Sequence, residues 1–98
     1  MNYPIRLREE AERDLSGAAE WYELQWTGLG NQFLDEVISV FNNIATEPLR
    51  FPVIYKKVRR ALITRFPFCA FYIIEKEHII VLAVLHASRD PNNWQVRT

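Results

Sequence analysis

The sequence is short of cysteine and glycine, and each shortage excludes a class of protein. Its 98 residues contain a single cysteine, Cys69, and only three glycines. One thiol cannot form an internal disulfide or supply the ligands of a thiolate zinc site, so a reducing, cytoplasmic environment is expected. The glycines form no phosphate-binding loop, and no nucleophile–base motif is recognisable. No cofactor is therefore expected.

Long apolar runs are missing as well. The most apolar stretch, "HIIVLAVLHA" (78–87), has the length of a strand, whereas a membrane-spanning helix needs about 20 apolar residues. The opening "MNYPIRLREE" carries no apolar segment of the secretory type, so neither export nor membrane attachment is expected. With 49% hydrophobic and 24% charged residues, the chain is expected to form one globular domain over residues 1–98.

Acidic residues are missing from one stretch of a chain whose net charge is zero. Residues 1–47 hold nine acidic and three basic side chains, whereas residues 48–98 hold three acidic and nine basic ones. Between Pro48 and Arg65, six basic residues occur without one acid. If the two halves form different elements, one face is cationic and suits a nucleic acid or an acidic protein segment. Ordinary solvated surface charge explains the same pattern equally well.

The hydrophobic residues that are present change their period along the chain. The segment "NYPIRLR" (2–8) alternates and predicts a short strand. From Glu9 the spacing becomes helical, with an apolar stripe formed by Ala11, Leu15, Ala18, Tyr22 and Trp26. After "TGLG" (27–30), a second helix carries the stripe Phe33, Leu34, Val37, Ile38, Phe41, Ile44 and Ala45. So short a link predicts an antiparallel helical hairpin that ends before Pro48.

After Pro52 the pattern is that of strands again. Three are predicted, at 57–66, 69–75 and 78–86, the last two forming a hairpin around Lys76 and Glu77. The order β-α-α-β-β-β predicts an α+β fold, in which the helical hairpin packs on one face of a small, mainly antiparallel sheet. Residues 79–85 are apolar without alternation, so both faces of that strand should be buried. Either the chain's own tail, with Trp94, or a partner must cover the second face.

Few residues could carry chemistry. His86 lies at the end of the last strand, where it could act as an acid or base, although such a histidine is more often a structural donor. His86 and His78 have no carboxylate at ligand spacing, so no metal site is predicted. Arg59 and Arg65 are predicted to share a strand face and could bracket a phosphate or a carboxylate.

The closing "SRDPNNW" (88–94) has a structural explanation for two of its residues. Asp90 as N-cap and Pro91 as first helical residue predict a helical turn. Trp94 should then fold back onto the sheet, although an indole beside Arg89 could also stack on a base or a partner.

The ordered set of motifs resembles the RelE/ParE superfamily of bacterial type II toxins. The likeness rests on "RR" entering a strand, "FPF" before "FYIIE", and "VLAVLHASRDP..W" at the end; "A..DL..A..WY" in the first helix adds to it. The resemblance implies the same β-α-α-β-β-β fold and a cognate antitoxin that wraps the sheet and neutralises the toxin in a hetero-oligomeric complex. Such modules serve plasmid stabilisation and growth inhibition.

The resemblance also implies a choice between two activities. RelE-like members cut messenger RNA in the ribosome and often carry an arginine where this chain has Cys69, and a terminal tyrosine or histidine where it has Trp94. A thiol cannot clamp a phosphate, and an indole cannot accept a proton. The pattern therefore favours the ParE-like members, which inhibit DNA gyrase by binding rather than by catalysis.

On this interpretation the functional surface, which contacts the target and the antitoxin, consists of Arg59, Arg60, Arg65, His86, Arg89 and Trp94. The first alternative is a ribosome-dependent mRNA endoribonuclease with His86 as acid or base and Arg65 and Arg89 holding phosphate. The second is an inactivated toxin relative that only binds an antitoxin.

Overall fold

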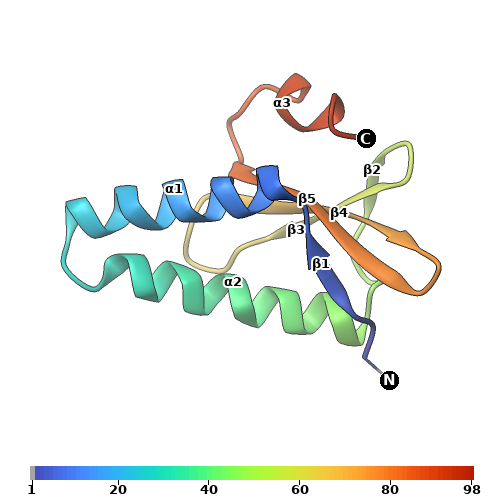
Figure 1. The fold of residues 1–98 in the computed structure, drawn as a ribbon, viewed down its shortest axis with the longest axis horizontal. Helices are drawn as coiled ribbons and strands as arrows, with labels where there is room; N and C mark the ends of the chain where they lie inside the picture. Colours follow the sequence, from blue (N-terminus) through green and yellow to red (C-terminus); the bar gives the residue numbers. More distant parts are fainter. Residues whose placement is uncertain (1) are drawn as a thin grey trace.

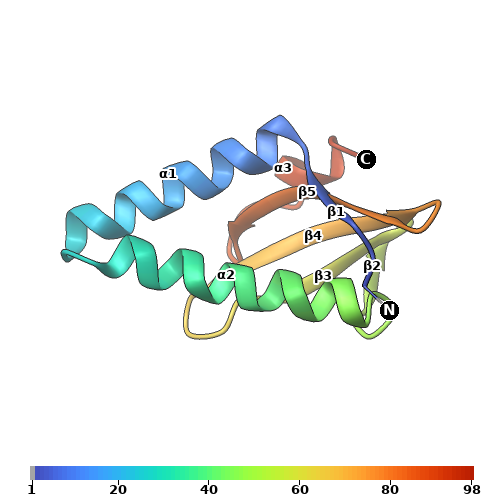
Figure 2. The same ribbon diagram turned by 60° about the horizontal axis from the view of Figure 1, so that its bottom comes forward.

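Two long helices lie along one face of a five-stranded sheet in the computed structural model, which describes residues 2–98 (Figure 1). The elements, in chain order, are β1 (Ile5–Leu7), α1 (Glu9–Gln25), α2 (Leu29–Thr46), β2 (Val53–Tyr55), β3 (Val58–Leu62), β4 (Phe68–Glu75), β5 (His78–His86) and α3 (Asn92–Gln95). Seen from below, the helical hairpin covers one side of the sheet, while α3 lies behind β5, close to the start of α1 (Figure 2). The predicted α+β fold is confirmed.

The sheet has the strand order β1-β5-β4-β3-β2. β1 is parallel to β5, and the other pairs are antiparallel. The β4–β5 hairpin runs from the pair Phe68–His86 to the pair Glu75–His78. Its turn, Lys76-Glu77, has positive φ at both residues (49° and 64°), which is the geometry of a two-residue hairpin turn even without the usual glycine.

Two details of the strand prediction were wrong. β2 was not foreseen, because its three residues follow Pro52 and are too few to show a period. The strand expected at 57–66 is β3, and it ends at Leu62. There the chain turns toward β4, with Ile63 N donating to Phe68 O at 2.8 Å and with Arg65 at a φ of 72°.

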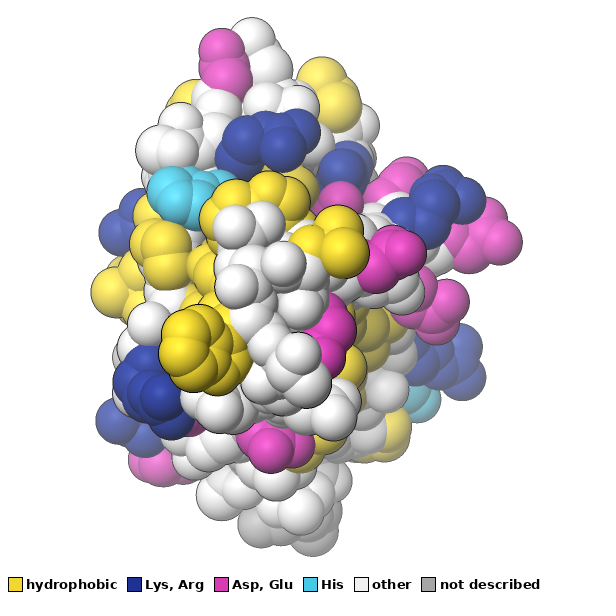
Figure 3. All heavy atoms as spheres, turned by 90° about the vertical axis from the view of Figure 1, so that its left-hand side faces the viewer, with side chains coloured by type: hydrophobic (Ala, Val, Ile, Leu, Met, Phe, Trp, Pro, Cys, Tyr) yellow, Lys and Arg dark blue, Asp and Glu magenta, His cyan; other side chains and the backbone are white. Residues whose placement is uncertain are grey.

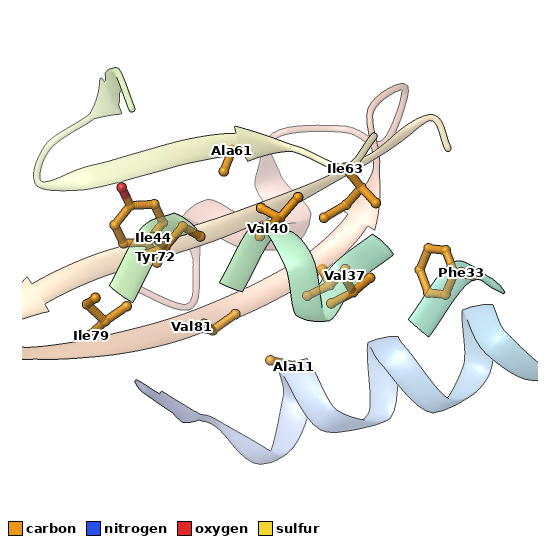
Figure 4. Packing of buried hydrophobic residues seen from close by; sticks show 12 residues of the cluster. Ala11, Phe33, Val37, Val40, Ile44, Ala61, Ile63, Tyr72, Ile79 and Val81 are labelled. Atoms are coloured by element: carbon orange, nitrogen blue, oxygen red, sulfur yellow. The ribbon is translucent and has the colours of Figure 1, made fainter. Parts of the chain in front are cut away.

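The main core lies between the hairpin and the sheet. Side chains of α2, among them Phe33, Val37 and Ile44, pack against Tyr72, Val81 and other residues of the strands (Figure 4). The Tyr72 hydroxyl donates to Pro48 O at 2.6 Å, and burial raises the pKa of Tyr72 to about 12. In the helical hairpin, α1 and α2 approach so closely at Gly30 that only glycine fits, because a Cβ there would lie 2.6 Å from Ala19 O.

β5 is buried on both faces, as its unbroken apolar run predicted. A β-bulge in β5 determines which side chains face each side. Phe71 of β4 pairs with Ala83, the next residue, Tyr72, pairs with Val81, and Leu82 of β5 therefore has no partner on β4. The extra residue reverses the alternation. The helix side thus receives Ile79, Val81 and Val84, and the opposite side receives Leu82, Ala83 and Leu85.

The second face is covered in large part by the chain's own tail. Trp94, only 6% exposed, stacks on Phe71 at a centroid distance of 4.6 Å and meets the Tyr55 ring edge-on at 5.8 Å. Of the two ways to cover this face, the tail is therefore the one that the structure uses here. No helix among the described residues combines the length and apolar character that crossing a membrane requires.

Candidate functional site

The structure does not bring the six predicted surface residues together. Arg59 lies beside the segment that follows α2, and Arg65 lies beside the first half of α2. Arg60 and Trp94 lie on the opposite side of the sheet, and only His86 and Arg89 share a site.

The expected clamp of Arg59 and Arg65 is wrong. Arg59 points to the helix side, where its guanidinium donates to Leu49 O at 3.2 Å and to Phe51 O at 2.6 Å, just beyond the end of α2. Arg65 lies after β3 has ended, so strand alternation no longer sets its direction. Its guanidinium reaches Glu36 at 3.3 Å and Gln32 at 3.4 Å in the first half of α2.

On the opposite side, Arg60 is exposed and Trp94 is not. The predicted helical turn is present, but its N-cap is Pro91 and not Asp90, and α3 begins at Asn92. Asp90 Oδ1 still accepts from Asn92 N at 2.9 Å, and so it helps to form the turn that carries Trp94 onto the sheet. In this conformation the buried indole has little surface to offer a base or a partner. Burial raises the pKa of the nearby Cys69 thiol, although Arg60 acts in the opposite sense. The buried thiol is therefore protonated and poorly reactive.

His86 and Arg89 meet at a hollow between α1 and the end of β5. The residues that surround it are Arg13, Asp14, Gly17, Ala18, Phe68, Val84, Leu85, His86 and Arg89. Arg13 was missed in the sequence, where it stands as one base among the acids of α1. Its spacing of four from Gly17 places both residues on one side of the helix, but no local pattern marks Arg13 as part of a site. The hollow combines apolar side chains with two arginines, Arg13 and Arg89, and with His86 and Asp14.

The hydrogen bonds of His86 limit its chemistry. Its Nδ1 accepts from Ser88 N at 3.1 Å and lies 2.7 Å from Ser88 Oγ, while its ring meets Phe68 edge-on at 5.4 Å. A backbone N–H can only donate, so Nδ1 acts as the acceptor toward Ser88 N, and Nε2 is the ring nitrogen that can donate outward.

Asp14, which lines the same hollow, is already engaged. Its Oδ2 accepts from Arg97 at 2.6 Å and from Val84 N at 3.1 Å, and the two ionised side chains are only 12% and 18% exposed. The carboxylate is thus used to hold the tail and the β5 edge. Among residues 2–98, no group of three or more His, Cys, Asp and Glu side chains could hold a metal ion.

Similar folds occur in known toxin–antitoxin systems. The chromosomal ParDE toxin–antitoxin system from P. aeruginosa aligns with a TM-score of 0.74 at 16% sequence identity, over 86% of this chain and 95% of that chain. The RelBE2 toxin–antitoxin complex from Mycobacterium tuberculosis aligns with a TM-score of 0.62 at 26% identity, over 88% of this chain and 99% of that chain. No curated protein matches the sequence.

The family model described as the ParE toxin of the type II toxin–antitoxin system parDE matches residues 5–91. This range runs from the start of β1 to Pro91 and includes the helical hairpin, the whole sheet and the hollow at His86. The predicted resemblance to RelE/ParE toxins is confirmed, and this chain belongs to the ParE toxin family of type II toxin–antitoxin systems.

Proposed function

We propose that this toxin inhibits DNA gyrase by binding it, and that a cognate antitoxin neutralises the toxin in a hetero-oligomeric complex in the cytoplasm. The observation that carries the proposal is the bond from Ser88 N to His86 Nδ1. With Nδ1 accepting this bond, Nε2 is the ring nitrogen that can donate outward, which suits recognition of an acceptor on a partner better than proton transfer.

The arginines support the same conclusion. Arg59 is held by main-chain carbonyls, and Arg65 lies in an exposed ion pair with Glu36. Neither of them lines the hollow at His86, so the two do not form a phosphate clamp beside that histidine. A nuclease would need such a clamp beside its acid and base. Arg13 and Arg89 remain at the rim of the hollow, where they suit anionic groups of a protein partner.

An assay with purified components tests the proposal. Wild-type toxin is added to DNA gyrase, ATP and relaxed plasmid, and supercoiling is followed on agarose gels. Stoichiometric inhibition that purified antitoxin reverses is the expected result. Unimpaired supercoiling at a large molar excess of toxin would contradict gyrase as the target.

A ribosome-dependent endoribonuclease is the second candidate, because Arg13, His86 and Arg89 surround one hollow. In that case, messenger RNA translated in the presence of toxin is cut at codon-defined positions, and His86→Ala abolishes the cuts. Primer extension on the transcripts distinguishes the two functions. Intact transcripts together with blocked supercoiling support the gyrase inhibitor.

A further inference from the structure

We infer that the aromatic end face of this toxin is the surface that docks on the inhibited protein, an inference that rests on the proposed function. The aromatic end face is formed by Trp21, Tyr22, Phe66 and Phe68, with His86 and Arg89 at one end and Arg65 at the other. Its occupant is a segment of the target protein that is apolar in the middle and carries carboxylates toward its ends.

The four aromatic rings form one connected group. Tyr22 meets Trp21 at a centroid distance of 5.2 Å, Phe66 at 4.9 Å and Phe68 at 5.9 Å. Phe68 in turn meets His86 at 5.4 Å. In the view onto the α1–α2 turn, hydrophobic side chains gather between a histidine with Lys or Arg side chains near it and a second basic group lower down (Figure 3).

Trp21 is the exposed member of this group, whereas Tyr22, Phe66 and Phe68 are partly buried against the main core and show only part of their rings. Trp21 is 57% exposed, and the neighbouring Leu24 and Trp26 are 83% and 73% exposed. Trp94, by contrast, is almost fully buried on the second face. An exposed cluster of large apolar side chains is unusual on a monomer and typically marks a binding surface.

The helical end that presents these rings is held rigidly. The Glu23 carboxylate accepts from Gly28 N at 2.9 Å and from Gly30 N at 3.0 Å, across the turn that joins α1 to α2. Below the surface, Phe33 packs on Tyr22 at 5.3 Å and on Phe66 at 5.2 Å. Rigid aromatic side chains lose little conformational entropy on binding, so they make efficient anchors.

The charges around the face favour a protein over a nucleic acid. Arg13 and Arg89 lie at the hollow beside His86, and Arg65 follows at the Phe66 end. Acidic groups are interspersed with them: Glu36 sits on Arg65 at 3.3 Å, and the exposed Glu20 precedes Trp21 in α1. A continuous phosphate backbone would meet these carboxylates, whereas a protein segment can place its own carboxylates at the basic ends alone.

Gly17 keeps the basic end of the face open. It lies within α1, where glycine is about 1 kcal/mol less favourable than alanine. A Cβ at Gly17 would have no atom within 4 Å, so no internal contact requires glycine at this position. A side chain there would instead project into the hollow that Arg13 and Arg89 border.

Three variants and a matched control test the inference. Trp21→Ala removes an anchor, Gly17→Leu fills the hollow, and Gly17→Ala raises helix propensity with a single methyl group. Leu49→Ala is the control, because Leu49 is 72% exposed but lies beyond α2. Each variant is assayed for inhibition of gyrase supercoiling, for binding to immobilised gyrase and for its midpoint of thermal unfolding.

We expect Trp21→Ala and Gly17→Leu each to weaken inhibition and binding about tenfold or more, the effect of losing one hot-spot contact. Gly17→Leu and Gly17→Ala should unfold at a higher temperature than wild type, so that lost inhibition in Gly17→Leu cannot come from unfolding. Leu49→Ala should inhibit like the wild type.

The possible failures are distinguishable. If wild-type toxin inhibits gyrase and Trp21→Ala and Gly17→Leu inhibit it equally well, the docking surface lies elsewhere and only this inference falls. If wild-type toxin neither binds nor inhibits gyrase, the proposed function falls with it. If the variants lose affinity for plasmid DNA alone in a gel-shift assay, the face binds nucleic acid, and the inference is overturned.

Discussion

Arg97 and Asp14 form an ion pair at 2.6 Å although 83 positions separate them in the sequence. The pair closes the edge of β5 beyond the end of β1: Asp14 accepts from Val84 N, and Arg97 donates to Leu82 O at 3.1 Å. Arg8 also donates to the Arg97 carbonyl. Two side chains thus satisfy main-chain groups that a further strand would otherwise have to satisfy, and they tie the tail to α1.

Breaking this pair from either side should destabilise the fold. Asp14→Asn or Arg97→Met leaves a mostly buried charge without its partner, and we expect each to lower the free energy of unfolding by about 2–3 kcal/mol. The double variant should lose less than the sum of the two, because the charges are coupled. Urea denaturation followed by circular dichroism measures the stability of all three variants.

The exposed pair Glu47–Arg50, with side chains 62% and 57% accessible, is the control, and Glu47→Gln should change stability by less than about 0.5 kcal/mol. Additive effects of Asp14→Asn and Arg97→Met would show that the contact contributes little.

Truncation to alanine should lower the stability of the fold strongly at Trp94 and only slightly at Trp26. Trp94 is 6% exposed and stacked on Phe71, whereas Trp26 is 73% exposed at the end of α1. Trp94→Ala should lower the free energy of unfolding by about 3–5 kcal/mol through lost burial and a cavity over the sheet. Trp26→Ala should change it by less than about 1 kcal/mol. Equal stabilities in urea would mean that α3 does not cover the second face in solution.

Arg59 and Arg60 are neighbours in sequence with different expected roles. Arg59→Ala removes two hydrogen bonds to the segment after α2 and should lower the free energy of unfolding by about 1–3 kcal/mol. Arg60 is exposed on the other side of β3, so Arg60→Ala should leave stability within about 0.5 kcal/mol of wild type. Thermal unfolding of both variants separates the two cases. A fully stable Arg59→Ala variant that no longer inhibits the target would instead identify Arg59 as a contact residue.

The hydrophobic pattern predicted most of the fold because burial governs it. The stripe through Phe33, Val37 and Ile44 and the unbroken run in β5 each appear in the structure as expected. What the pattern could not reveal were features of one or two residues. The bulge at Leu82 and the positive φ of Arg65 change the direction of later side chains without leaving a period in the sequence.

The site was predicted less completely for a related reason. The assignment of Arg65 to a strand face assumed that β3 continues past Leu62, and its failure separates Arg65 from Arg59. His86 and Arg89 were predicted because they stand at the end of the apolar run of the last strand, where one turn holds them together, with Arg89 N donating to His86 O at 3.0 Å. Arg13 belongs to the same hollow only through the packing of α1 on β5, which no local spacing encodes.

Tyr72 should make stability depend on pH in the alkaline range. Burial raises its pKa from 10.0 to about 12 in the folded protein, whereas in the unfolded chain the phenol ionises at its ordinary value. Stability from this group is complete below pH 10.0 and is lost as the pH rises toward about 12, because ionisation then favours the unfolded state. The shift corresponds to about 2–3 kcal/mol. Tyr72→Phe removes the hydroxyl group and its hydrogen bond to Pro48 O. At neutral pH the variant should therefore be about 1 kcal/mol less stable than wild type. Between pH 10 and 12 it should lose less stability than wild type, because it has no phenol to ionise. Urea midpoints measured at intervals across that range give the comparison, and parallel curves for the two proteins would mean that Tyr72 ionises normally in the folded state.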